Sequence, residues 1–315
     1  MCSQKDQKIK LCYHMSMSAN EGLFYAEASQ RINVYTRNPI MLIEQLSIKQ
    51  PRTISFSSCG RYLAVGCLDG YIFVFRVIDN KHKLIWKNRI AEPEIRFIEF
   101  TPDDNYVFFS GNKTVHRLSI ANGKVEMIKQ FDTTMIWQMQ KVDNAFLFAV
   151  CGKKSTELYY MQYYLDETPV NKWIQIPVDA GHGEFVLISK SHEMLFIFKN
   201  MGMGKTGVKT YHFNNKIITL THKEDFIADV TGGYYKLSPD GNLLAITSIA
   251  EYASTDLPNK ITRKTRLFQV NPFLELIMFD TPIACGAGFG PKSDLLLLPG
   301  NPGKIITLNT YNLHT

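Results

Sequence analysis

The sequence predicts an all-β fold of repeated four-stranded antiparallel units, and three observations carry this prediction. Short apolar runs rich in Val, Ile, Phe and Tyr recur along the whole 315-residue chain, as is typical of strands. Small polar turns that contain Gly, Pro, Asn or Asp separate these runs, and such residues favour chain reversal. No stretch keeps the apolar spacing of an amphipathic helix for three turns, so we expect almost no helix.

The clearest unit is the stretch 53–77, TISFSSCGRYLAVGCLDGYIFVFRV. A polar turn at 57–60 separates its first two strands, and Asp69-Gly70 separates the second strand from the third. Asp-Gly between two β-rich runs is a strong hairpin signal, because Gly accepts the positive φ that the turn requires.

The first turn of this unit recurs along the chain at a mean step of about 46 residues. A repeat of this length with four short strands is typical of a propeller blade. We therefore predict a seven-bladed β-propeller of four-stranded antiparallel blades, in a single domain over residues 1–315. Four clear copies of the turn begin at Phe56, Phe100, Leu237 and Phe289, and three weaker copies begin at Met15, Met139 and Ile188.

The runs with strand character follow this repeat in chain order. In the first three units they are 9–16, 23–28, 31–36 and 41–46; 53–56, 62–67, 71–77 and 83–87; and 95–100, 106–110, 114–120 and 125–130. In the next three units they are 135–139, 145–151, 156–164 and 173–176; 185–188, 194–198, 207–213 and 216–221; and 234–237, 243–249, 265–270 and 274–279. The seventh unit has 284–288, 295–298 and 304–308. Its blade therefore has three strands unless the segment 311–315 adds a stub.

The longest departure from the repeat is an insertion in the sixth unit, at 250–264. Long loops on rigid scaffolds often carry function, and this one ends in basic residues. The candidate partner-binding residues are therefore Lys260, Arg263, Lys264 and Arg266. A solvated hairpin extension is the alternative interpretation.

The runs 53–77 and 238–248, the latter SPDGNLLAITS, resemble WD40 repeats. In that family an S-x-D-G-x-x-L-A-S/T-G run precedes a D-G/x-x-V-x-V-W-D strand. Asp69 and Gly70 match the turn of the family pattern, and Phe75-Arg76 stands where Trp-Asp would. No Trp-Asp dipeptide occurs in the sequence, and Gly-His occurs once.

The resemblance implies a β-propeller that serves as a non-catalytic scaffold for protein binding. It also implies that Asp69, as a structural turn residue, is the one clear remnant of the family's side-chain hydrogen-bond network. By analogy, the binding surface would be formed by loops on one propeller face. The turns 57–60, 102–105 and 239–242 are the candidates for its rim.

Charge and cysteine content argue against several classes of partner and ligand. The net charge is +6, which is modest for this length and argues against a nucleic-acid partner or an anionic membrane surface. Six cysteines lack zinc-ligand spacing, so we expect reduced thiols and a cytoplasmic protein. The N-terminus is polar and no apolar run is long enough to cross a membrane. We expect a protein partner, no cofactor, no metal and no small-molecule substrate.

Two other functions stay open at this point. A propeller hydrolase would hold a metal ion in the central channel, although the eight histidines form no pair with metal-ligand spacing. A peripheral membrane or nucleic-acid binder would use the basic sixth-unit loop. The run 202–206, GMGKT, resembles half of a phosphate-binding loop, but Lys199 stands where the motif needs Gly and a β-rich run follows. We interpret that run as a hairpin turn.

Overall fold

The structure is a computed structural model and contains strands without helices in the part of the chain it describes. No described segment is therefore a helix long and apolar enough to cross a membrane. The described residues are 14–18, 24–28, 31–36, 39–133, 135–142, 145–152, 155–162, 172–176, 185–189, 191, 193–202, 205–214, 217–228, 231–252, 261–281, 286–290, 292–298 and 304–308.

Within these ranges the strands form seven antiparallel sheets. The first three sheets are β1 (His14–Met17), β2 (Phe24–Ala28), β3 (Ile32–Thr36) and β4 (Leu42–Leu46); β5 (Pro51–Phe56), β6 (Tyr62–Cys67), β7 (Tyr71–Ile78) and β8 (Lys81–Arg89); and β9 (Phe97–Phe100), β10 (Tyr106–Ser110), β11 (Thr114–Ser119) and β12 (Val125–Gln130). The next two are β13 (Ile136–Val142), β14 (Ala145–Cys151), β15 (Thr156–Gln162) and β16 (Lys172–Ile176); and β17 (Phe185–Ser189), β18 (Met194–Gly202), β19 (Lys205–Asn214) and β20 (Ile217–Ala228).

The sixth sheet has β21 (Thr231–Leu237), β22 (Leu243–Tyr252), β24 (Lys264–Gln269) and β25 (Leu274–Asp280), with β23 (Ile261–Thr262) paired to the end of β22. In the described residues the last sheet has three strands, β26 (Gly288–Phe289), β27 (Leu295–Leu298) and β28 (Lys304–Thr307). The predicted all-β propeller of four-stranded antiparallel blades is confirmed at this level. The segment 311–315, the proposed stub, lies outside the described residues.

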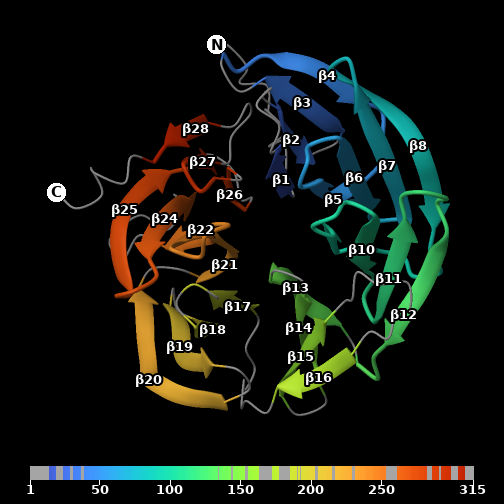
Figure 1. Ribbon diagram of the computed structural model, residues 1–315. Coiled ribbons are helices and arrows are strands. Elements are labelled where there is room, and N and C mark those ends of the chain that lie inside the picture. Colours follow the sequence, from blue (N-terminus) through green and yellow to red (C-terminus); the bar gives the residue numbers. More distant parts are fainter. Residues whose placement is uncertain are drawn as a thin grey trace, which may run out of the picture.

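The sheets follow one another around a central axis in chain order, and the first strand of each sheet lies nearest the axis (Figure 1). Neighbouring inner strands contact one another around the whole ring, and β26 contacts β1. The last described sheet therefore lies beside the first. We call the first strand of each sheet its inner strand.

The core lies between adjacent sheets, because strand alternation sends successive side chains to opposite faces. Along β6, Leu63 and Val65 join an apolar cluster with the first sheet. Ala64 lies between them in the sequence and joins the cluster with the third sheet, around Phe100 and Val107. Both faces of β6 are thus buried, and full burial of each large apolar side chain contributes about 1.5–3 kcal/mol.

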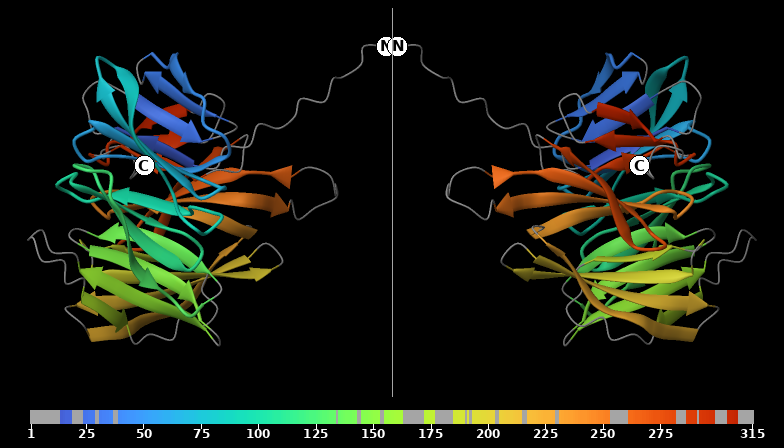
Figure 2. Two further views of the ribbon diagram at one scale, coloured as in Figure 1. Left: turned by 90° about the vertical axis from the view of Figure 1, so that its right-hand side faces the viewer. Right: turned by 90° about the vertical axis from the view of Figure 1, so that its left-hand side faces the viewer.

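Consecutive strands are antiparallel, so the first and second turns of each sheet lie at opposite ends of the strands. We call the face that carries the first turns, such as 57–60 and 239–242, the first-turn face. The opposite face carries the second turns, including the Asp69-Gly70 turn and the β22–β23 hairpin. Figure 2 shows this hairpin extending past the other sheets on one face of the ring.

The expected loop at 250–264 is shorter than predicted. Strand β22 continues to Tyr252, and its last residues Glu251 and Tyr252 pair with Thr262 and Ile261 of β23. Backbone pairing extends the hairpin, because each added residue pair satisfies its N–H and C=O groups. Only 253–260 lie outside the described residues here.

Candidate functional site

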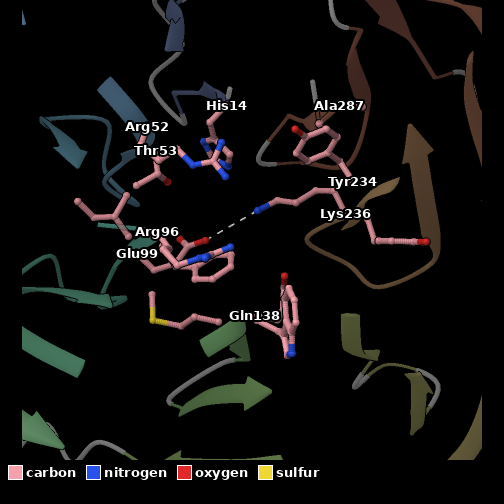
Figure 3. A pocket seen from close by; sticks show the side chains of 15 residues that line it. His14, Arg52, Thr53, Arg96, Glu99, Gln138, Tyr234, Lys236 and Ala287 are labelled. Carbon is pink, nitrogen blue, oxygen red and sulfur yellow. Dashed lines mark ion pairs between the residues drawn. The ribbon is translucent and has the colours of Figure 1, made fainter. Parts of the chain in front are cut away.

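A cavity of about 190 Å³ lies where the inner strands converge around the axis. Figure 3 shows its side chains approaching from several directions. They come from β1, β5, β9, β13 and β21 and from the residues before β9 and β26. The lining residues are His14, Arg52, Thr53, Arg96, Phe97, Ile98, Glu99, Trp137, Gln138, Met139, Tyr234, Tyr235, Lys236, Gly286 and Ala287.

Strand alternation explains why polar side chains reach the cavity. In β9, Ile98 and Phe100 are buried in the core between sheets, while Glu99 between them is partly exposed and lines the cavity. In β21, Tyr235 and Leu237 join an apolar cluster, while Lys236 between them is exposed. An inner strand can therefore pack a core on one face and present charge on the other.

Charged residues of opposite sheets meet across the cavity. Nζ of Lys236 lies 3.8 Å from Oε1 of Glu99, and Figure 3 shows Lys236 reaching over from the side opposite Glu99. Glu94 lies between two arginines, with Oε1 at 3.1 Å from Nε of Arg52 and Oε2 at 3.9 Å from Nη1 of Arg96. The cavity region therefore holds three permanent cations and two carboxylates.

His14 adds no further positive charge at neutral pH. Its Nδ1 accepts a hydrogen bond of 3.4 Å from the backbone N–H of Ile54. Burial, followed by the positive charge of Lys236, lowers the pKa of His14 from 6.5 to about 4, while the charge of Glu99 acts in the opposite direction. The imidazole is therefore neutral at pH 7.

The alternative of a central metal finds no donor set here. Among the described residues, no group of three or more His, Cys, Asp or Glu side chains could hold a metal ion. Glu99 is the one acidic side chain among the described residues that line the cavity. Charged side chains beside Trp137 and Tyr234 form a surface suited to binding a polar ligand group.

The predicted basic residues of the sixth unit are only partly placed. Lys260 lies outside the described residues. Arg263 lies between β23 and β24, and Lys264 begins β24. Arg266 is farther along β24, where its Nη1 contacts Oε2 of Glu275 in β25 at 3.2 Å. Arg266 is therefore part of the sheet and is not on the inserted loop.

The predicted turn residue Asp69 makes a local contact. Its Oδ1 accepts a hydrogen bond of 3.4 Å from the backbone N–H of Tyr71, and its backbone C=O accepts one of 3.3 Å from Arg89. The next residue, Gly70, has φ +80°, and a Cβ there would lie 2.3 Å from the backbone oxygen of Glu92. The glycine therefore constrains this turn more tightly than the aspartate does.

The first turns, which were the candidate rim of a binding face, use polar groups to hold one another. Ser189 Oγ donates a hydrogen bond of 2.8 Å to the backbone C=O of Gly241 in the next sheet. The N–H of Asp240 in turn donates one of 3.1 Å to Oγ of Ser293. These contacts give the first-turn face a structural role.

Sequence reasoning did not single out the cavity residues Arg52, Arg96 and Lys236. A signal exists in the sequence for Arg96 and Lys236, because each is a cation in or directly before an inner strand and lies between apolar or aromatic residues. Such an interruption indicates a side chain that faces the axis instead of the core.

Comparison with known proteins supports the fold. Neither a family model nor a curated protein matches the sequence. The structure is similar to the β-propeller domain of Cps50 (Swd1) from Myceliophteria thermophila, with a TM-score of 0.68 and 14% sequence identity. The likeness covers 96% of this chain and 98% of that domain. It confirms the propeller fold that the resemblance to WD40 repeats implied.

Proposed function

We propose that the chain is a non-catalytic scaffold that binds a protein or peptide partner at the central cavity. The supporting observation is the convergence of Arg52, Arg96 and Lys236 with Trp137 and Tyr234 in one cavity. Aromatic and arginine side chains are enriched where proteins bind one another. The propeller fold is consistent with this role.

The proposal includes the architecture that presents the cavity. We take the seven sheets as the blades of one closed ring and residues 1–315 as one domain, because the inner strands contact one another from β1 to β26 and back to β1. We also propose a reducing, cytoplasmic location. The free thiols of Cys59, Cys67 and Cys151 support it.

The β22–β23 hairpin is a second contact surface in this proposal. Most lining residues lie at the start of their inner strands or directly before them, at the end away from the first turns. The hairpin lies on that same end of the sheets. A partner seated over the cavity would therefore have the hairpin, with Arg263 and Lys264 at its base, beside it.

Site-specific photo-crosslinking tests the proposal. A benzophenone amino acid replaces Gln138 in the cavity, and in a matched variant it replaces Met127 on the outer strand β12, where the side chain is 59% exposed. The intact chain is irradiated in a cell extract and the captured proteins are identified. A third variant lacks residues 253–260.

We expect the cavity position to capture a defined protein that the outer position does not capture. Equal capture at Gln138 and Met127 would mean nonspecific contact and would contradict a cavity site. If capture from Gln138 is lost when residues 253–260 are deleted, the hairpin is an essential part of the interface.

A further inference from the structure

We propose that the central cavity binds an anionic group, a carboxylate or a phosphate carried by a peptide segment, on Arg96 and Lys236. The inference rests on the proposed function of the same cavity, and it names the chemistry of the group that enters it. The supporting observation is that, among the described residues, the carboxylates of the cavity region accept hydrogen bonds while donors of the two cations have no oxygen acceptor.

The guanidinium of Arg96 has more N–H donors than the described residues provide with acceptors. Its side chain is 17% exposed, and within the described residues its Nη1 has the sulfur of Met135 as hydrogen-bond acceptor, at 2.9 Å. Its Nε is buried and has no hydrogen-bond partner among the described residues, and the carboxylate of Glu94 is 3.9 Å from Nη1. A guanidinium carries five N–H donors, and a thioether is a weak acceptor. The group is therefore short of oxygen acceptors.

The ammonium of Lys236 also has N–H donors without an acceptor at hydrogen-bond distance among the described residues. Its side chain is 47% exposed, and its Nζ is 3.8 Å from Oε1 of Glu99. That distance permits Coulombic attraction but exceeds the range of an N–H···O hydrogen bond. An ammonium offers three donors. An anion between Lys236 and the opposite wall would meet donors that no described group occupies.

The two carboxylates of the cavity region are better satisfied than the two cations. Glu94 accepts a hydrogen bond of 3.1 Å from Nε of Arg52. Glu99 accepts one of 3.3 Å from Oγ of Ser55. Free donors on cations, combined with engaged acceptors on carboxylates, favour an incoming anion over an incoming cation.

The surroundings strengthen this preference. Trp137 and Tyr234 line the cavity, and apolar walls lower the local dielectric, so each charge–charge contact is stronger than in water. The pKa of His14, lowered to about 4, leaves that side chain neutral. Binding would therefore not require protonation of His14 at neutral pH.

Titration calorimetry on the full chain tests the inference with four capped tripeptides as probes: triglutamate, triphosphoserine, triglutamine and trilysine. Two arms, glutamate and phosphoserine, distinguish the carboxylate from the phosphate. The variants are Arg96→Gln and Lys236→Gln. The control is Lys124→Gln, which removes a lysine that is 69% exposed in the β11–β12 turn, away from the cavity.

We expect saturable binding of at least one anionic tripeptide and none of triglutamine. Each cavity variant should weaken that binding at least about tenfold, because charge-assisted hydrogen bonds are lost. The Lys124→Gln control should bind as the wild type does. Lys236 is half exposed, so its variant remains informative if thermal melting shows that Arg96→Gln is poorly folded.

Three results would overturn the inference: no saturable binding of either anionic probe, equal weakening by the control, or preference for trilysine. The proposed function can be judged separately. If photo-crosslinking captures a partner while no anionic probe binds, the scaffold function stands and the anion site fails. If anionic probes bind the cavity while no partner is captured, the anion site stands and the scaffold function fails.

Discussion

Asp104 holds the first turn of the neighbouring sheet through Ser58: its Oδ1 accepts a hydrogen bond of 2.8 Å from the Ser58 backbone N–H. Its other oxygen accepts one of 2.9 Å from the N–H of Cys59. Asp104 is 6% exposed and has φ +58°, a region that Asp and Asn tolerate better than most residues. This carboxylate therefore helps to join the second and third sheets, which the Ser55–Glu99 hydrogen bond and apolar packing also hold together.

Removal of this carboxylate should destabilise the ring. We expect Asp104→Ala to cost about 2–3 kcal/mol of unfolding free energy, because two backbone donors lose a charged acceptor. Asp104→Asn keeps one acceptor oxygen and should cost less. The matched control is Asp79→Asn, at an exposed aspartate that also has positive φ, +48°. Urea unfolding measures all three variants, and equal stability of Asp104→Ala and wild type would contradict the contact's role.

The Asp69-Gly70 turn should depend on its glycine more than on its aspartate. We expect Gly70→Ala to cost about 2 kcal/mol or more, because a Cβ at φ +80° meets the Glu92 oxygen. Asp69→Ala loses one local hydrogen bond of 3.4 Å and should cost less than about 1 kcal/mol. Thermal melting compares the two variants. A larger loss of stability in Asp69→Ala than in Gly70→Ala would show that the aspartate hydrogen bond, and not the glycine, is the main constraint on this turn.

Stability should fall in mild acid because of His14. Its pKa is about 4 in the folded chain against 6.5 ordinarily, so between these values the unfolded state binds more protons. The contribution of His14 to the free energy of unfolding is therefore complete above pH 6.5 and is lost as the pH falls towards 4. The total loss is about 3 kcal/mol.

His14→Gln isolates this contribution, since Gln can still accept the Ile54 N–H but does not titrate. The stability difference between wild type and variant should change with pH over that window, in favour of the variant at low pH. Parallel curves of unfolding free energy against pH would show that His14 titrates normally.

Cys67 should resist alkylation in the folded chain. Its side chain is buried, and burial, with a smaller effect of Asp69, raises the pKa of its thiol to about 12. Thiolate is the reactive form, so iodoacetamide at neutral pH should leave Cys67 unmodified while it labels the partly exposed Cys59 and Cys151. Peptide mass spectrometry reads each site, and rapid native labelling of Cys67 would contradict its burial.

The repeat could be predicted from the sequence because its signals are local. The turns that begin after Phe56, Phe100 and Leu237 use Gly, Pro and Asp at reversal positions, and the runs between them, rich in Val, Ile, Phe and Tyr, predict strands. From β2 to β16 the strand bounds accordingly lie close to the expected ones. Strand β1 begins at His14, and residues 9–13 of the expected first strand lie outside the described residues. At 250–264 the strand extends beyond its expected end because backbone pairing, which needs no special side chains, continues β22 to Tyr252, in agreement with the alternative of a hairpin extension.

The cavity could not be predicted in the same way. Lys236 and Glu99 lie in different sheets on opposite sides of the axis, and no local pattern links residues so far apart in the chain. The link arises only when the ring places their inner strands around one cavity. The polarity of Arg52 and Arg96 is visible in the sequence, but a surface position explains an isolated cation equally well.

The central claim is that the partner binds at the cavity, and its most direct test is the affinity of the photo-captured partner for charge-reversed variants. We expect Lys236→Glu to weaken binding at least about tenfold. Lys124→Glu, an equal charge reversal outside the cavity, should leave the affinity unchanged. Equal affinities of the wild type and both variants would contradict a binding site in the central cavity.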